Sequence, residues 1–254
     1  MAQGFLTAQV RGHVTEVTMR NAAKHNSFSA AMSTELVDTL RDAQGAGSRA
    51  VILRAEPGVK VWSAGHDISE LPDGDQDPLA WTNTLAAMME DVAAFPLPLI
   101  AAVEGGVWGG ACELVMAADI VVAHKASTFA ITPAKLGVAY SSAGISRFLA
   151  ALPVHIAKEM FFTAEPISAQ RAYDFGVVNH LVADADELEL RCWQLADVIS
   201  QRAPLTIRSA KAEIQAMTLP GESVNESAQL RSLRDSAWTS EDYRGGVRAF
   251  TEML

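Results

Sequence analysis

Two glycine-rich stretches, WSAGHDI at Trp62–Ile68 and EGGVWGGACE at Glu104–Glu113, decide how the rest of this sequence is interpreted. Each follows an apolar run that predicts a buried strand, and each leads into a predicted helix. Glycine leaves backbone N–H groups uncovered and permits positive φ, so amides in such turns can converge on one oxygen atom. The pair therefore predicts a split oxyanion hole, in which two amides stabilise developing negative charge.

The elements on either side of these stretches repeat a common plan. The run AVILRA at Ala50–Ala55 predicts a buried strand that leads into the first stretch, and LPLIAAVEG at Leu97–Gly105 leads into the second. A helix that carries Glu113 then precedes a third predicted strand, DIVVA at Asp119–Ala123. This recurrence indicates an α/β fold made of stacked turns of a β-β-α spiral. A doubly wound parallel sheet gives a similar pattern along the chain, so the spacing alone leaves both open.

The two ends of the chain differ in pattern. Near the N-terminus, alternating apolar and polar residues predict a hairpin that turns at Arg11 and Gly12, and helical periodicity follows over Ser29–Ala43. Farther along, the periodicity becomes helical almost throughout. We therefore expect a β-β-α spiral core over residues 1–153 and a helical C-terminal region over residues 154–254.

Composition and charge disfavour several classes of protein. The 254 residues are 49% hydrophobic and 20% charged, which is typical of a globular domain, and the net charge of −10 disfavours a nucleic-acid partner. The most apolar segment, Phe95–Ala118, is interrupted by prolines, glycines and a glutamate, so it does not predict a membrane span. The first residues, MAQGFLTAQVR, lack the pattern of a signal peptide, and we expect a cytoplasmic protein.

Cysteine and histidine spacing gives no indication of a metal site. Cys112 and Cys192 lack CxxC spacing, and the six histidines form neither HxxxH nor HExxH. Cys112 has no recognisable base in the sequence, so we expect it to pack as a small hydrophobic side chain. Trp62 and Trp108 are likewise expected to belong to the core.

The order of these motifs resembles the crotonase superfamily, also called the enoyl-CoA hydratase/isomerase family. The resemblance covers nearly the whole chain and is collinear, which makes it more specific than either glycine motif alone. Besides AGHDI and GGACE, the segments that carry it are KHNSFSAAM, DIVVA, PISAQRAYDFGVVNHLV and SEDYRGGVRAF.

This resemblance implies a spiral fold that binds an acyl-coenzyme A thioester and polarises its carbonyl with the amides of His66 and Gly110. Coenzyme A is then part of the substrate, and no separate cofactor or metal is expected. Family members usually form trimers or paired trimers, so we expect a homotrimer or homohexamer assembled through the C-terminal region, which also closes the pocket. The positions expected to contact substrate or coenzyme A are Lys24, Ala64, Gly65, His66, Asp67, Ile68, Gly110 and Thr132.

One departure from the family pattern bears on the reaction. Hydratases of this family use two glutamates, and the first corresponds to Glu113. Pro133 stands where the second belongs, and proline can neither accept nor donate a proton at its side chain. Simple hydration is therefore disfavoured, and Glu113 could instead be a structural carboxylate.

More specific stretches, VWSAGHDI, VEGGVWGGA and TPAKLGV followed by Tyr140, resemble family members that decarboxylate malonyl-CoA thioesters. The resemblance implies decarboxylation of methylmalonyl-CoA, or a similar short 2-substituted malonyl-CoA, to propionyl-CoA. Tyr140, together with Thr132 or the His66 ring, is expected to orient the substrate carboxylate. Loss of CO2 leaves the enolate directly, so the reaction needs no base that removes a proton from carbon.

Two alternatives remain open at this point. The chain could be a hydratase or isomerase of another specificity that uses Glu113 as its acid or base, or an acyl-CoA-binding protein without catalysis. A basic residue that relatives place near the C-terminus to reach coenzyme A is replaced here by Met253, and Arg248 could supply the contact instead.

Overall fold

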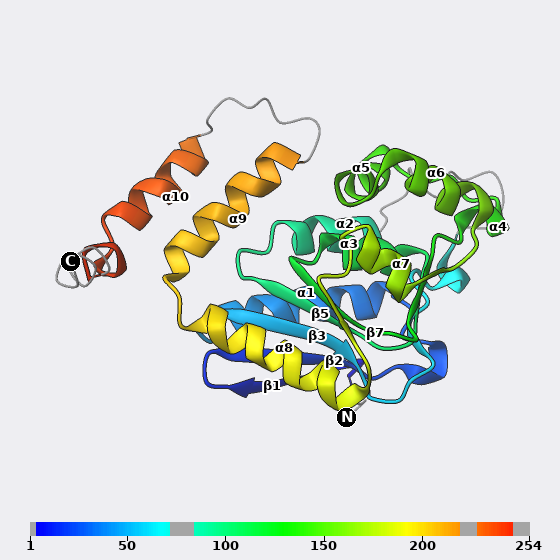
Figure 1. Ribbon diagram of the computed structural model, residues 1–254, viewed down its shortest axis with the longest axis horizontal. Helices are drawn as coiled ribbons and strands as arrows, with labels where there is room; N and C mark the ends of the chain where they lie inside the picture. The colour runs from blue at the N-terminus through cyan, green and yellow to red at the C-terminus, as the bar shows by residue number, and fades with distance from the viewer. Residues whose placement is uncertain (1–3, 72–83, 219–227, 246–254) are drawn as a thin grey trace.

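The computed structural model describes residues 4–71, 84–218 and 228–245. Figure 1 shows the strands covered by helices on both sides, with two helices of the C-terminal part standing apart. The strands are β1 Leu6–Arg11, β2 Val14–Met19, β3 Ala50–Ala55, β4 Val61–Ser63, β5 Leu99–Val103, β6 Gly106–Trp108, β7 Ile120–His124, β8 Thr128–Ala130, β9 Ile167–Ser168 and β10 His180–Val182. The α-helices are α1 Ala30–Gly45, α2 Thr84–Ala93, α3 Gly110–Ala117, α4 Pro133–Leu136, α5 Ser142–Ala151, α6 Val154–Thr163, α7 Ala169–Asp174, α8 Ala185–Ser200, α9 Pro204–Thr218 and α10 Ala228–Trp238, and two 3-10 helices span Ala22–Lys24 and Ile68–Glu70.

From β3 to β8, consecutive strands alternate between two sheets. The larger sheet has the order β1-β2-β3-β5-β7-β10 and the smaller has the order β4-β6-β8-β9. Three times in succession the chain passes through one strand of the larger sheet, one strand of the smaller sheet and then a helix: β3, β4 and α2, then β5, β6 and α3, then β7, β8 and α4. This is the predicted β-β-α spiral. A doubly wound sheet is excluded because its successive strands would share one sheet.

The strand β3 explains why the predicted run Ala50–Ala55 is apolar without alternation. All six of its residues are buried, and it pairs in parallel with β2 on one side and β5 on the other. Val51 and Leu53 belong to the core between the sheets and helices α1 to α3, whereas Ala50 and Ile52 pack with the apolar face of α8. A parallel strand covered on both faces reads as a continuous hydrophobic run.

The N-terminal predictions are also confirmed. The strands β1 and β2 pair antiparallel, with Arg11 opposite Val14, as expected of a hairpin turning at Gly12. The helix α1 begins directly after Ser29, whose hydroxyl accepts a hydrogen bond from the amide of Met32. This cap satisfies one of the first-turn amides that an isolated helix leaves without a partner.

The predicted boundary at residue 153 needs correction, because the sheets continue beyond it. The strand β9 pairs with β8, and β10 completes the larger sheet by pairing with β7. Between and after these strands, α7 and α8 pack on the core, so the region 154–254 is not helical throughout. Both strands are very short, which explains why their sequence shows no alternation that reveals them.

The last described helices form a pair that reaches away from the sheets (Figure 1). The helices α9 and α10 pack against each other. Lys211 ties α9 to the core: its ammonium donates to Leu97 O at 2.9 Å and to Asp119 Oδ2 at 2.7 Å. Among the described residues, no helix is long and apolar enough to cross a membrane.

Candidate active site

The first glycine-rich loop is held by the segment that precedes α1. Asn26 is fully buried and donates from Nδ2 to the carbonyl of Trp62 at 2.9 Å. The Ser63 hydroxyl donates to the carbonyl of Asn26 at 2.7 Å, and the amide of Phe28 donates to the carbonyl of Gly65 at 2.7 Å. Because these bonds join residues far apart in sequence, the KHNSFS segment fixes the backbone of the WSAGHDI loop.

The same arrangement leaves the amide of His66 available. On either side of it, the amide of Ala64 donates to His25 O at 2.9 Å and the amide of Asp67 donates to Phe28 O at 3.0 Å. The amide of His66 has no acceptor among the described residues. Buried amides without a partner are uncommon, so this one is a candidate for binding a ligand oxygen.

The second loop presents a comparable amide at the start of α3. Gly109 adopts a φ of 55°, and its own amide donates to Ala130 O at 2.8 Å. Gly110 is the first residue of the helix, and its N–H has no acceptor in the described part of the chain. The positive end of the helix dipole adds to the attraction for an anionic oxygen.

The two loops approach so closely that only glycine fits between them. A Cβ atom on Gly65, whose φ is 82°, would lie 2.6 Å from the amide nitrogen of Gly110. A Cβ atom on Gly110 would in turn lie 3.6 Å from the amide nitrogen of His66. The predicted oxyanion amides are therefore neighbours in space, contributed by loops more than forty residues apart in sequence.

Both amides border a cavity of about 160 Å³. Its wall combines the two glycine-rich loops with residues of α2, α3, α4 and α5 and the loop before α5. The lining residues include the predicted positions Ala64, His66, Ile68, Gly110, Glu113, Thr132 and Tyr140. Apolar side chains, among them Leu85, Met89, Leu136 and Val138, form much of the rest.

Glu113 lies in this wall and uses both carboxylate oxygens. It is 7% exposed, and its Oε1 lies 2.5 Å from Nη1 of Arg147, while its Oε2 accepts a hydrogen bond from the Tyr140 hydroxyl at 2.7 Å. The contact with Glu113 and burial raise the pKa of Tyr140 well above its usual range, burial being the larger cause. The Tyr140 hydroxyl therefore keeps its proton and uses it in the hydrogen bond to Glu113.

Sequence reasoning identified Tyr140 and Glu113 but missed Arg147. Arg147 follows Glu113 by 34 positions, and no spacing rule joins a residue on α3 to one on α5. The one available signal is a single basic residue in the apolar helix that follows Tyr140. Sequence reasoning also missed Glu90, an exposed residue of α2 that lines the same cavity.

The ring of Tyr140 is fixed by packing as well as by its hydroxyl. It makes edge-to-face contacts with Phe148 and Phe161, with ring centroids 5.8 Å and 5.3 Å away. A Cβ atom on Gly144 would lie 2.4 Å from a carbon of this ring, so the missing side chain at Gly144 makes the room that the tyrosine occupies.

Two further predicted groups face the cavity without hydrogen bonds. The Thr132 hydroxyl and the His66 ring have no hydrogen-bond partner among the described residues. Burial lowers the pKa of His66 against the opposing effects of Glu70 and Asp67, so the ring is neutral at physiological pH. Both groups can accept or donate a hydrogen bond, depending on what enters the cavity.

The remaining predicted binding residues differ in exposure. Asp67 caps the short 3-10 helix that follows it, and hydrogen bonds from Ser69 and then from Lys24 hold the pKa of its carboxyl below the usual range. The Lys24 ammonium lies 3.1 Å from Asp67 Oδ2 and its side chain is 62% exposed. Ile68 is 62% exposed beside the cavity. Met253, Arg248 and residues 72–83 lie outside the described residues.

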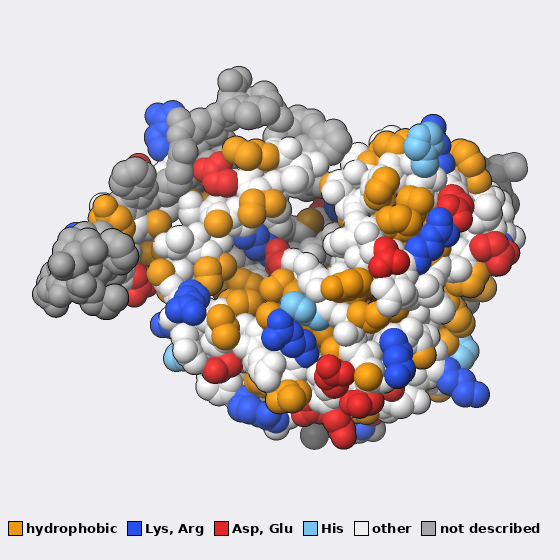
Figure 2. Space-filling model, in the orientation of Figure 1, with side chains coloured by type: hydrophobic (Ala, Val, Ile, Leu, Met, Phe, Trp, Pro, Cys, Tyr) orange, Lys and Arg blue, Asp and Glu red, His pale blue; other side chains and the backbone are white. Residues whose placement is uncertain are grey.

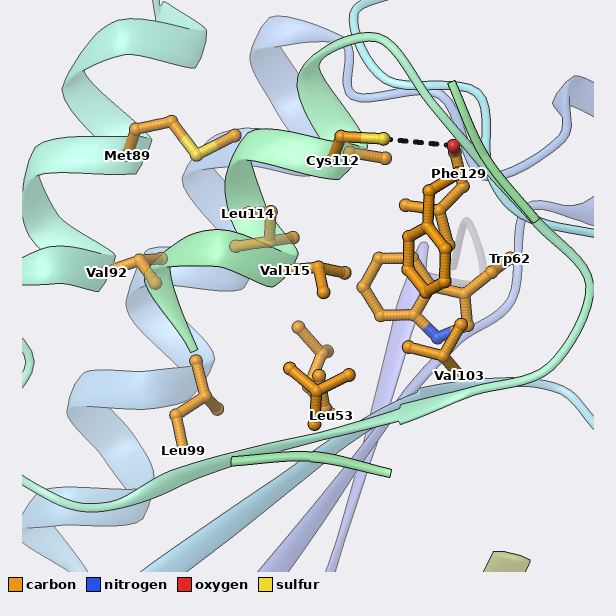
Figure 3. Packing of buried hydrophobic residues seen from close by; sticks show 14 of the residues in the cluster. Leu53, Trp62, Met89, Val92, Leu99, Val103, Cys112, Leu114, Val115 and Phe129 are labelled. Carbon is orange, nitrogen blue, oxygen red and sulfur yellow. Dashed lines mark hydrogen bonds between the residues drawn. The ribbon is translucent and has the colours of Figure 1, made fainter. Parts of the chain in front are cut away.

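Cys112 is a packing residue, as expected. Figure 3 shows its side chain among the buried hydrophobic residues of the core, with a dashed line from the sulfur to a backbone carbonyl oxygen. The thiol contacts Val107 O at 3.1 Å and Ala130 O at 3.3 Å, and burial raises its pKa to about 12. Trp62 is fully buried and donates to Ala102 O, whereas Trp108 is half-buried.

A second cavity of about 520 Å³ lies between α9 and the core. Figure 2 shows this face of the molecule hollowed there. Its lining includes Met116, Ile207 and Ile214, and Arg147 borders both cavities. In the part of the chain that the structure describes, no group of His, Cys, Asp and Glu side chains is arranged to hold a metal ion.

Comparison with known proteins places this geometry in context. The family model described as enoyl-CoA hydratase/isomerase matches residues 9–254. The chain is 39% identical to methylmalonyl-CoA decarboxylase of Escherichia coli strain K12, over 99% of this chain and 97% of that protein. It is 32% identical to carnitinyl-CoA dehydratase of Escherichia coli strain SMS-3-5, over 95% and 93% of the two chains.

A solved structure agrees with the sequence comparison. The crystal structure of methylmalonyl-CoA decarboxylase complexed with 2S-carboxypropyl CoA superposes with a TM-score of 0.83 at 38% identity, covering all of this chain and 97% of that one. The similarity extends over both the spiral core and the C-terminal helices.

Proposed function

The chain belongs to the enoyl-CoA hydratase/isomerase family, and from that membership we propose that it decarboxylates methylmalonyl-CoA, or a similar short 2-substituted malonyl-CoA. With methylmalonyl-CoA the product is propionyl-CoA. The similarity at 39% identity to a methylmalonyl-CoA decarboxylase supports this choice of reaction within the family. Coenzyme A belongs to the substrate, and the proposed reaction uses no further cofactor.

In the proposed mechanism the thioester carbonyl binds to the amides of His66 and Gly110. The bond between the α-carbon and the carboxyl carbon breaks, its electron pair enters the thioester as an enolate, and CO2 leaves. Both amides belong to residues that line the cavity and neither has an acceptor among the described residues, which supports their assignment as donors to the carbonyl oxygen. A donor of this kind typically lowers the barrier by about 3 kcal/mol. A proton then adds to the α-carbon.

The observation that carries the proposal is the state of the carboxylate pair on which family hydratases rely. Pro133 stands at the second position, where it begins the short helix α4. The first carboxylate, Glu113, is engaged by Arg147 and Tyr140 at both oxygens. Activation of water needs a carboxylate that can accept a proton, whereas loss of CO2 needs none.

We place the substrate carboxylate beside Tyr140, Thr132 and the His66 ring. Decarboxylation is fastest when the breaking bond stands perpendicular to the thioester plane, because its electrons then pass directly into the carbonyl π system. The Thr132 hydroxyl and the neutral His66 ring can donate to the carboxylate and fix that orientation. Tyr140 limits the space beside the carboxylate, and its hydroxyl donates its proton to a hydrogen bond with Glu113.

Family membership also guides our proposals for how coenzyme A binds and how the subunits assemble. We propose that Lys24 and the backbone of Ala64 to Ile68 contact coenzyme A where it enters the cavity, and that Asp67 acts by holding Lys24. A homotrimer or homohexamer built through the C-terminal helices remains our proposal for the assembly.

One observation favours a second candidate, an enoyl-CoA hydratase. Glu90 and Glu113 both line the cavity, so two carboxylates are present even though Pro133 replaces the usual partner. Mass spectrometry of the thioesters after incubation separates the candidates. Loss of CO2 from methylmalonyl-CoA supports decarboxylation, whereas addition of water to crotonyl-CoA with methylmalonyl-CoA unchanged supports the hydratase. Thermal stabilisation by both thioesters without turnover of either supports a binding protein.

A further inference from the structure

Arg147 is the feature of the cavity that the proposed mechanism does not use. Its guanidinium is the one cation among the described residues that line the cavity, and its side chain is only 12% exposed. Glu113 and Glu90 supply two negative charges to the same wall. Burying the charge on Arg147 is costly unless the guanidinium interacts with an anion in the site.

Among the described residues, Arg147 is the one cation that pairs with Glu113. Nη1 of Arg147 lies 2.5 Å from Oε1 of Glu113, and the other oxygen of Glu113 accepts a hydrogen bond from a neutral hydroxyl, that of Tyr140. Glu90, by contrast, is exposed, so water screens its charge. Removal of the guanidinium would leave Glu113 as an uncompensated buried anion at the wall of the acyl cavity.

An anionic acyl group would meet this wall directly. The substrate proposed above carries a carboxylate on its α-carbon, and the cavity borders Glu113 within the same small space as the two oxyanion amides. Two carboxylates in a low-dielectric pocket repel each other strongly unless a cation accompanies them. Glu113 does not use all the donors of this guanidinium, since the buried Nε of Arg147 has no acceptor among the described residues.

We propose that Arg147 is a specificity-determining residue, which balances the charge of Glu113 and so allows the cavity to accept an acyl-CoA whose acyl group bears a carboxylate. This inference rests on the proposed function for the identity of the substrate. The preference for an anionic over a neutral acyl group then depends on Arg147, which lies on α5 and does not belong to the oxyanion hole.

The test compares the binding of two probes to the intact protein by calorimetry. 2S-carboxypropyl-CoA is a thioether that carries the carboxylate, and propionyl-CoA is a thioester whose acyl group carries none, so each probe is compared with itself across the variants. In Arg147→Met we expect the Kd of 2S-carboxypropyl-CoA to rise by at least about tenfold, while that of propionyl-CoA changes less than about threefold. Arg147→Lys keeps the positive charge and should retain most of the affinity for the anionic probe.

A double variant distinguishes charge balance from a structural role. Glu113→Gln in the Arg147→Met background removes the unbalanced anion, so it should restore most of the affinity for 2S-carboxypropyl-CoA. A purely structural role of Arg147 would weaken both probes together, and removal of Glu113 would not repair it. Propionyl-CoA binding also verifies that each variant keeps the folded cavity.

The outcomes separate this inference from the proposed reaction. An equal loss of affinity for both probes, an unchanged affinity for the anionic probe, or no binding of that probe by the unmodified protein overturns the role given to Arg147. Binding is measured without turnover, so a protein that shows the expected ratio but releases no CO2 from methylmalonyl-CoA would overturn the proposed function and leave the inference about Arg147 in place.

Discussion

The amide nitrogen of His66 lies 3.6 Å from the position that a Cβ atom on Gly110 would occupy. Neither amide has an acceptor among the described residues, and both border the same cavity. Hydrogen bonds from the segment before α1 use the amides on either side of His66, so the loop is rigid where it presents this N–H. Both amides are therefore available to one ligand oxygen, as the proposed oxyanion hole requires.

Removal of one donor tests this arrangement. Gly110 is the first residue of α3, a position that tolerates proline, so Gly110→Pro should delete the N–H without ending the helix. Gly110→Ala is the matched control, because it adds a Cβ near Leu85 but keeps the amide. We expect kcat for decarboxylation to be at least about 100-fold lower in the proline variant than in the alanine variant. Equal kcat values in steady-state assays would contradict the oxyanion assignment.

Tyr140→Phe tests the hydroxyl while keeping the aromatic packing with Phe148 and Phe161. The variant leaves Oε2 of Glu113 without its donor, so we expect a loss of stability of about 1.5 to 3 kcal/mol in denaturant unfolding. Decarboxylation should also slow by about tenfold, since the wall that positions the carboxylate changes. Tyr173→Phe, at an exposed tyrosine of α7, should change neither quantity. Unaltered kinetics in Tyr140→Phe would show that the Tyr140 hydroxyl has no role in the reaction.

Stability should depend on pH through His66. Burial lowers the folded-state pKa of its ring below the ordinary value of 6.5. As the pH falls below 6.5 the unfolded chain binds a proton that the folded protein resists, so stability is lost down to the folded pKa and is unaffected above 6.5. Thermal unfolding of the wild type and of His66→Gln should therefore differ more at about pH 5 than at about pH 8, with the wild type losing more. Parallel curves across this range would argue against a buried neutral ring.

Cys112 should be dispensable for catalysis. With its pKa raised to about 12, the thiol contains almost no thiolate at neutral pH and is shielded from reagents. We expect Cys112→Ala to keep kcat within about threefold of the wild type while it loses some stability through the space left in the core. Iodoacetamide should leave activity intact in the folded protein. Inactivation that tracks alkylation of Cys112 would contradict its assignment as a packing residue.

Much of the fold could be predicted from the sequence, because buried strands and capped helices leave local patterns. Ala50–Ala55 is apolar since both faces are covered, and Ser29 marks the start of α1. The strands β6, β8, β9 and β10 could not be located in this way, because two or three residues are too few for a period to appear. Their pairing is a property of the tertiary structure.

The residues of the candidate site likewise fall into those that local sequence reveals and those that only the tertiary structure reveals. Gly65 could be found because the close approach of two backbones demands glycine there, and Gly109 could be found because its φ is positive. Arg147 could not be found, since its pairing with Glu113 depends on how two helices face each other across the core. The hydrogen bond from Tyr140 to Glu113 likewise appears only in three dimensions. Because of it, the Tyr140 hydroxyl does not donate to the substrate, and the residue instead forms part of the cavity wall.

The central claim is that CO2 leaves a thioester whose enolate is held by the amides of His66 and Gly110. The most direct test is incubation of the protein in heavy water with methylmalonyl-CoA that carries an isotopic label in its free carboxyl group. We predict labelled CO2 and propionyl-CoA in equal amounts, with one deuterium at the α-carbon of each product molecule, and loss of both signals in Gly110→Pro. Release of labelled CO2 no faster than in buffer alone, while the folded protein hydrates crotonyl-CoA, would contradict the account.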